Sequence, residues 1–417
     1  MRRESAGNGR QQNKNGLRGR LLRQALAVAF AVMLAAGSAG EALAEAGNGG
    51  QAAGAGESAG TSGDPADTSG GAGAATAPVI EYDALEELVR GSNPEVKAKR
   101  VDLDRWVDQY QAARDEIMEN RASLREEARE LKEDGDEEGY RHYTEQARLL
   151  KESADELDRQ IRSLNSASNT MDLRLAEDTA TLSAQDVMAA WHSLRLDRDS
   201  AAAQLELAGY QAEQLTRRMG LGMAAQADVD QARRDQEAAK NRVDTLDAEL
   251  AKLKRELLLI TGYTYDGEVE IGELPPADTD RAGAISPEAD RQKAWGNSYE
   301  LRQKRHSGFS GTNKERHSKE RSMEESEQSM YTKLISLSGQ VNTAKTACLA
   351  ARSAMAAADF DFKAAEHKWQ LGMINRQDYL KAKAAYADAR AVSGKAEISL
   401  LGALNRYDWA VRGLILE

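Results

Sequence analysis

Two aspartates stand at matching places in a turn that the chain contains twice. The stretch "LGMAAQAD" recurs 150 positions later as "LGMINRQD", so Gly222 and Asp228 match Gly372 and Asp378. Glycine favours the left-handed residue that ends a helix, and a carboxylate is stabilised in the first turn of the next helix. Helix-end chemistry alone could explain both aspartates. A role at a functional site is the alternative that stays open.

The other side chains that could do chemistry do not form a recognisable catalytic or metal site. Five histidines are present, and none has a metal-ligand spacing to cysteine or carboxylate partners. Serine, histidine and aspartate are all available for a catalytic triplet. However, the chain has no nucleophile-elbow motif and no glycine-rich phosphate loop. We therefore expect no enzyme activity, no cofactor and no bound metal.

Long helices must position the two turns. On both sides of each turn, apolar residues recur alternately three and four positions apart, which is the pattern of a coiled-coil seam. Arg198, Gln236 and Ser393 are the breaks in this pattern. The seams cover residues 191–219 and 229–260 in the first copy, and 341–369 and 379–410 in the second. The sequence thus predicts two antiparallel helical hairpins in register.

Flanking segments give weaker signals. Asp83 can cap a short helix that Gly91 ends, and Asn93 can cap the next helix with Pro94 in its first turn. Residues 116–164 are charged and helical in pattern, which favours more coiled coil. The segment after Gly262 alternates briefly and predicts one short strand with a crossover. Residues 304–330 are polar with little apolar periodicity, so we expect a loop there.

The first 44 residues have the pattern of a targeting segment. A basic leader precedes an unbroken apolar run at residues 25–36, and Ala42 and Ala44 fit a cleavage site. Such a run is short for a membrane span, so we expect export followed by cleavage, with an uncleaved anchor as the alternative. Residues 45–79 are dominated by small residues and predict a flexible linker.

The composition narrows the classes of partner. The net charge is −12, and removal of the basic leader would make the chain more acidic still. An acidic chain repels phosphate backbones, so we expect no nucleic-acid partner. Aromatic residues are 5% and charged residues 30% of the chain, which suits long helices better than a thick globular core. Cys348 is the single cysteine and is expected to pack as a small hydrophobe.

The paired repeat resembles the TolC-type outer membrane efflux proteins. The residues that carry the resemblance are "NPEVKAKR" from Asn93, "NSYELRQKR" from Asn297, and the two turns with their "LGM…D" segments. The returning helices end in "LLLITGY" and "DWAVRGL", as in that family. In-register repetition is a more specific signal than any of these motifs alone.

This resemblance implies a function and partners. It implies a homotrimeric cylinder in the cell envelope, at the outer membrane, that serves as an export duct. A periplasmic-type adaptor and an energised inner-membrane pump would be its partners. Gly222, Asp228, Gly372 and Asp378 would form the pore entrance and docking turns, where a ring of carboxylates favours cations. The alternative is a non-conducting coiled-coil structural or adaptor protein of the envelope.

One feature of the family is missing from the sequence. Family members insert membrane strands between the helices, and such strands need about 9–11 residues of alternating apolar character. Residues 116–186 contain no such stretch, and the second copy is shorter between its start and its turn. We therefore predict an all-α protein of long antiparallel coiled-coil hairpins with little or no β-barrel. Its parts are a signal peptide (1–44), a linker (45–79), a first repeat (80–270) and a second repeat (271–417).

Overall fold

The computed structural model describes residues 78–166, 169–264, 268–306 and 312–415. The predicted signal peptide and nearly all of the predicted linker lie outside these residues. Helices hold 86% of the described residues, and the predicted all-α class is confirmed. The one sheet in the described ranges is a parallel pair of two-residue strands, β1 (Val79–Ile80) and β2 (Glu270–Ile271). The second of these is the short strand expected after Gly262.

The chain divides into two compact units, which are described separately. One unit contains residues 101–170. In it, most of α3 (Pro94–Glu133) turns through Gly135, which has a φ of 81°, into α4 (Glu137–Leu164). A seam that includes Tyr110, Ile117 and Leu157 is buried between these helices. The charged segment predicted as coiled coil is therefore a helical hairpin.

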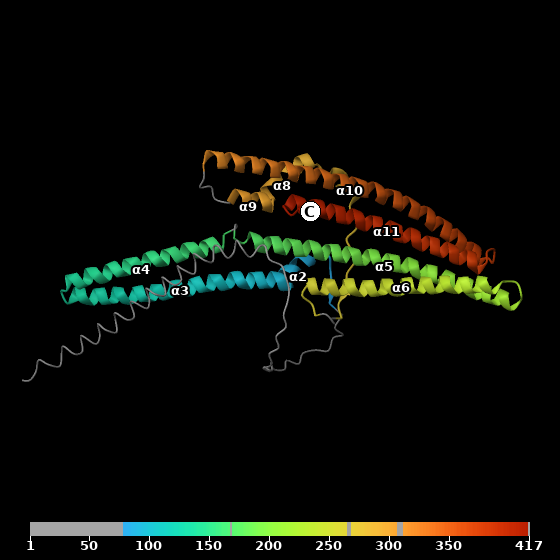
Figure 1. The fold of residues 1–417 in the computed structure, drawn as a ribbon, viewed down its shortest axis with the longest axis horizontal. Helices are drawn as coiled ribbons and strands as arrows, with labels where there is room; N and C mark the ends of the chain where they lie inside the picture. Colours follow the sequence, from blue (N-terminus) through green and yellow to red (C-terminus); the bar gives the residue numbers. More distant parts are fainter. Residues whose placement is uncertain (1–77, 167–168, 265–267, 307–311, 416–417) are drawn as a thin grey trace, which may run out of the picture. The chain divides into compact units, whose positions relative to one another are not determined.

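The other unit contains both predicted helical hairpins (Figure 1). The first hairpin is α5 (Met171–Gly220) with α6 (Gln226–Ile260). The second is α10 (Asn313–Gln370) with α11 (Arg376–Arg412). Helices α5 and α11 pack on each other, so the four helices follow one another in the order α6, α5, α11, α10. Four short helices complete the unit: α2 (Leu85–Ser92), α7 (Thr279–Ala284), α8 (Pro287–Asn297) and α9 (Tyr299–His306).

Residues of the predicted seams lie in the cores of the two hairpins, together with Met188 and Leu334, which lie just before the predicted seams. In the first hairpin, Met188 and Leu257 are fully buried, and they pack with Ile80 and Leu85 from the start of the described chain. In the second, Leu334, Val341, Cys348 and Leu400 are fully buried together. Cys348 thus packs as the small hydrophobe that the sequence predicts. A small cluster of Leu182, Trp409 and Leu414 joins α5 to the end of α11.

Three local predictions are wrong. Asp83 does not cap α2, whose N-cap is Ala84, and Gly91 lies inside α2, which ends at Ser92. Much of the polar segment predicted as a loop is helical, because α10 begins at Asn313. Local contacts stabilise this start: Glu315 accepts a hydrogen bond from the backbone N–H of Thr312 at 2.7 Å, and Arg316 pairs with Glu320 one turn later.

None of the helices in the described part of the chain combines the length and apolar character that a membrane span requires.

Candidate functional site

The two predicted turns have the same backbone structure. Gly222 has a φ of 71° and Gly372 a φ of 69°, so both occupy the left-handed region. In each turn the residue after the glycine donates back to the carbonyl five residues earlier. The N–H of Met223 reaches Arg218 and that of Met373 reaches Lys368, both at 2.8 Å. This is the hydrogen-bond pattern of a Schellman motif, for which glycine at the left-handed position costs least. The left-handed conformation predicted for both glycines at the end of a helix is confirmed.

The helices that follow the turns begin differently. Asn375 caps α11, since its side-chain oxygen accepts from the backbone N–H of Asp378 at 2.8 Å. Ala225 stands at the equivalent position before α6 and has no side-chain acceptor. Here the carboxylate of Asp228 reaches back and accepts from the N–H of Ala225 at 3.3 Å. The side chain of Asp228 therefore stabilises the start of its own helix, as expected if the aspartates serve only the helix ends. At Asp378, by contrast, the recorded hydrogen bond uses the backbone N–H.

The tips expose a matching set of apolar side chains. Leu221, Met223, Leu371 and Met373 flank the two glycines, and they are between 58% and 72% exposed. Exposed apolar residues are ordinary when they are scattered singly, but here four of them recur at two equivalent positions. The two turns therefore present the same apolar pattern twice.

Contacts between α5 and α11 bring the two hairpin ends together. The guanidinium of Arg376, in the first turn of α11, lies 5.1 Å from the ring centre of Tyr210 on α5. One to two turns further on, Lys383 pairs with Glu206 at 2.6 Å. Asp388 then accepts hydrogen bonds from Ser200 and Gln204. The predicted site residues Gly222, Asp228, Gly372 and Asp378 thus belong to neighbouring hairpin ends.

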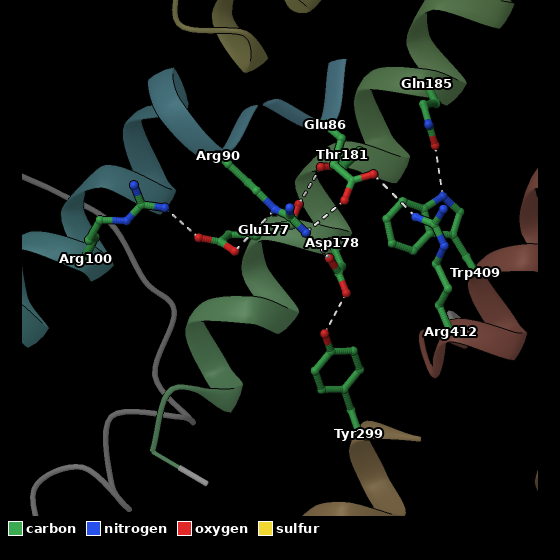
Figure 2. A network of polar contacts seen from close by, with 10 residues as sticks. All are labelled: Glu86, Arg90, Arg100, Glu177, Asp178, Thr181, Gln185, Tyr299, Trp409 and Arg412. Carbon is green, nitrogen blue, oxygen red and sulfur yellow. Dashed lines mark hydrogen bonds and ion pairs between the residues drawn. The ribbon is translucent and has the colours of Figure 1, made fainter. Parts of the chain in front are cut away.

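The opposite end of the hairpins holds a polar network that the sequence does not reveal (Figure 2). Arg90 on α2 pairs with Glu86 at 2.8 Å and lies 3.6 Å from Glu177 on α5. Glu177 also accepts from Arg100, at the start of α3, at 2.7 Å. The Tyr299 hydroxyl donates to Asp178 at 2.6 Å. Helices from both repeats therefore meet in one cluster of charges.

The end of α11 joins the same network. Arg412 pairs with Glu86 at 3.4 Å and lies over the ring of Trp409 at 4.9 Å. The Trp409 indole N–H donates to Gln185 at 2.9 Å. These partners are far apart in the sequence, so periodicity could not have found them. The network fixes the returning end of the second repeat against the first.

Matching asparagines close each repeat beside this network. The side-chain amide of Asn93 donates to the carbonyl of Ile260 at 2.8 Å, and that of Asn297 donates to Val411 at 3.1 Å. Asn93 also caps α3, as predicted, because its oxygen accepts from the N–H groups of residues 95 and 96. In both repeats, one asparagine ties the start to the end of the returning helix.

Burial shifts the titration of two side chains in the network. Desolvation raises the pKa of Asp178, while the hydrogen bond from Tyr299 and the charge of Arg90 act to lower it. The pKa of Tyr299 is raised by desolvation first, and then by its bond to Asp178. The Tyr299 hydroxyl therefore keeps its proton at neutral pH and donates it in the hydrogen bond to Asp178. In the described ranges, no group of three or more histidine, cysteine or carboxylate side chains could hold a metal ion.

Comparison with known proteins gives structural matches only. No protein family profile matches the sequence, and no curated protein matches it. The outer-membrane channel OprN is 12% identical with a TM-score of 0.46, over 80% of this chain and 90% of that one. CusC is 14% identical with a TM-score of 0.45, over 78% and 95%. The outer membrane protein VceC of Vibrio cholerae is 14% identical with a TM-score of 0.41, over 63% and 76%. These matches are to outer membrane channel proteins, at identities of 12–14% and with TM-scores of 0.41 to 0.46.

Proposed function

We propose that this protein is a passive component of an export duct in the cell envelope. It works with an energised inner-membrane pump and a periplasmic-type adaptor, as its resemblance to outer membrane efflux proteins implies. The observation that carries the proposal is the pair of in-register hairpins that end in the same exposed turn. A chain that only needed to fold a helix back on itself would not need to keep Leu-Gly-Met on the outside of both turns.

The turns are the proposed docking surface for the adaptor. Leu221, Met223, Leu371 and Met373 offer two equivalent apolar patches to one partner. Such repeated patches suit a partner that presents a helical hairpin to each of them. Docking would cover side chains that are otherwise left in water, which is favourable by the apolar area removed from solvent.

Asp228 and Asp378 are the proposed residues of the duct entrance. Both are exposed beside the turns. In a ring of several copies, their carboxylates would approach one another and favour cations. Asp228 gives one oxygen to the N–H of Ala225, whereas the recorded hydrogen bond at Asp378 uses its backbone N–H.

A second copy of the chain is the proposed partner along the hairpins, in a homotrimer. An exposed and uncharged stripe follows α10 at alternating spacings of three and four. Its equivalent on α5 is covered by α11 within the chain, for instance where Ser200 donates to Asp388. A ring of copies would cover the free stripe in the same way. The stripe contains Ser336, Gly339, Thr343, Thr346, Ala350, Ser353, Ala357 and Phe360.

Conductance of the purified oligomer tests the proposal. We expect a defined ring by native mass measurement, with cation-selective conductance in planar bilayers. Replacing both Asp228 and Asp378 by asparagine should reduce the selectivity but preserve the helix content. A matched control replaces Asp244 and Asp361, which are exposed on the same hairpins away from the turns. A monomer without conductance would contradict the proposal and support the structural or adaptor alternative.

A further inference from the structure

The end of the second hairpin that lies farthest from its turn is basic, although the chain as a whole is acidic. Helix α9 and the first nine residues of α10, 313–321, belong to this end, and α9 packs beside α10 (Figure 1). Together they contain seven lysine or arginine residues and three glutamates, whereas the whole chain has a net charge of −12. We call these seven cations the basic end: Arg302, Lys304, Arg305, Lys314, Arg316, Lys319 and Arg321.

Local partners balance only part of this positive charge. Glu300 pairs with Lys304 at 2.8 Å, and Glu320 pairs with Arg316 at 3.0 Å. The third glutamate accepts a hydrogen bond from a backbone N–H at the start of α10. Three cations are exposed and have no ion pair or hydrogen bond recorded within the described part of the chain: Arg305, Lys314 and Arg321. These three side chains therefore present unbalanced positive charge to the solvent.

Folding of α10 does not require this charge. The start of a helix carries partial positive charge, so cations are unfavourable in its first turn. Helices α2, α4 and α8 follow this rule, with two acidic residues each in the first turn. The first nine residues of α5, the long helix that opens the first hairpin, contain three acidic residues and one arginine. The cations at the start of α10 are thus a feature of the second hairpin alone.

The basic end lies outside the surfaces that the proposed assembly uses. The stripe proposed to contact the next copy starts at Ser336, which is about 20 Å along α10 from Arg321. The turn at Gly372 follows the other end of α10, and a helix of 58 residues is roughly 90 Å long. In the proposed duct, the turns face the adaptor, so the opposite end of the second hairpin faces the outer membrane. This step rests on the proposed function.

The acidic composition of the chain does not keep the basic end away from an anionic surface. At 0.1 M salt the Debye length is about 10 Å, so a surface interacts mainly with the charges that face it. The acidic run that follows on α10 starts at Glu324, ten positions after Lys314, which is about 15 Å along the helix. The foremost cations can therefore approach an anionic surface while the acidic residues stay screened from it.

We propose that the basic end attaches the protein to the anionic lipid surface of the outer membrane. Guanidinium and ammonium groups form charge-assisted hydrogen bonds with the phosphate oxygens of lipid headgroups. A layer of headgroups offers many such oxygens side by side, which suits cations that are spread over two helices. Each lysine or arginine near an anionic leaflet raises the binding constant about fivefold. The attachment is peripheral, since these polar helices stay at the level of the headgroups.

Vesicle binding of the exported protein tests the proposal. The exported form is used because the predicted leader at residues 1–44 is itself basic and would bind the same lipids. We compare vesicles of phosphatidylcholine with vesicles that also contain phosphatidylglycerol. The protein should bind the anionic vesicles at least about tenfold more tightly, and added salt should remove the difference. Equal binding to the two kinds of vesicle, or binding that salt does not weaken, would overturn the proposal.

Removing the three unbalanced cations provides the variant. The change is Arg305→Gln with Lys314→Gln and Arg321→Gln, in which glutamine keeps a good helix former at each position. Binding to the anionic vesicles should fall about a hundredfold, while binding to phosphatidylcholine stays the same. An unchanged affinity for the anionic vesicles would show that the basic end does not make the contact.

A matched control removes the same amount of charge from the other compact unit. Three exposed cations on α3 and α4 also lack a recorded partner in the described ranges, and the control is Arg125→Gln with Lys151→Gln and Arg162→Gln. This variant should bind the vesicles as the parent does. If both triple variants lose affinity equally, the total charge of the chain decides the binding and the proposal fails.

Native mass measurement separates lipid attachment from the other outcomes. The basic-end variant should form the same oligomer as the parent, with the same helix content. Loss of the oligomer in this variant would overturn the proposal, because the cations would then hold copies of the chain together. A parent protein that binds anionic vesicles but forms no ring and does not conduct would contradict the proposed function and leave lipid attachment standing. A conducting ring without affinity for anionic vesicles would overturn lipid attachment alone.

Discussion

Two leucines near the end of α6 have opposite surroundings. Leu257 is fully buried in the first hairpin, whereas Leu259 is 67% exposed. Leu257→Ala removes buried methyl groups and leaves a cavity, so we expect a loss of about 2–5 kcal/mol in the free energy of unfolding. Leu259→Ala is the control and should change it by less than about 0.5 kcal/mol. Denaturant unfolding of both variants measures the difference. Equal losses would show that the seam is misassigned.

Asp178 should make the stability of the repeat unit depend on pH. Glu86 and Arg90 on α2, Glu177 on α5 and Tyr299 on α9 surround its carboxyl, and burial is the largest influence on its raised pKa. A folded-state pKa above the unfolded value means that the folded chain binds the proton more tightly. Asp178 therefore makes its full contribution to the free energy of unfolding below pH 3.8, its ordinary pKa. This contribution is lost as the pH rises through the raised pKa of the folded state.

An asparagine at this position tests the direction of that effect. Asp178→Asn cannot ionise, but its side-chain oxygen can still accept from Tyr299. We therefore expect the free energy of unfolding of the variant, relative to that of the parent, to increase from about pH 4 to about pH 7. Urea unfolding of both proteins at the two pH values measures this change. Tyr299→Phe is a useful companion, because it removes a bond that lowers the pKa of Asp178. A loss of stability at pH 7 would mean that the attraction of Arg90 outweighs the burial.

Single residues were predictable where their role is local. Asn93, Asn375 and Pro94 stand at helix starts, and both turn glycines are left-handed, as the sequence indicates. The prediction at Asp83 was wrong because α2 begins at Leu85, two residues after the predicted cap, and its N-cap is Ala84. The network around Arg90 could not be predicted, because its partners come from helices that only the tertiary fold brings together.

At the scale of elements, the backbone of the two turns allows the cost of an alanine at Gly222 or Gly372 to be estimated as a change in the free energy of unfolding. A Cβ at Gly222 or Gly372 would meet no atom within 4 Å, so only the left-handed backbone opposes a side chain there. Gly222→Ala and Gly372→Ala should each cost about 1–2 kcal/mol, as measured by thermal unfolding. Gly220→Ala is the matched control. It lies in α5 with equal space, and it should instead be stabilising by up to about 1 kcal/mol. A much larger loss at either turn would mean that the tip is packed against something.

The hairpins were the most predictable elements, because a seam of nineteen positions repeated in register gives a strong periodic signal. The start of α10 was the least predictable. Its residues have few apolar neighbours to bury, so a search for apolar periodicity interprets them as a loop. Ion pairs one turn apart and good helix-forming residues hold this segment in a helix instead.

At the scale of the whole molecule, the repeat leaves one helix face without its partner. The face of α5 that includes Ser200 is covered by α11, but the equivalent face of α10, which includes Ala350, is exposed. Two repeats can satisfy only one such contact within a chain. A contact of the same kind on the free face of α10 would have to come from another copy of the chain. Successive copies related by rotation would then close a ring.

A charge placed on that face should therefore break the assembly without breaking the fold. Ala350→Glu adds a carboxylate to an exposed helical position, so the free energy of unfolding of the separate chain should change by less than about 0.5 kcal/mol. In a ring, the same carboxylate would be buried against the next copy without a partner, at a cost of several kcal/mol per contact. Native mass measurement should find the variant as a monomer with the helix content of the parent. Ala122→Glu, on an exposed face of α3 in the other unit, should leave the assembly intact. If Ala350→Glu assembles as the parent does, the free face of α10 lies outside the contact between copies. The ring must then be held together elsewhere.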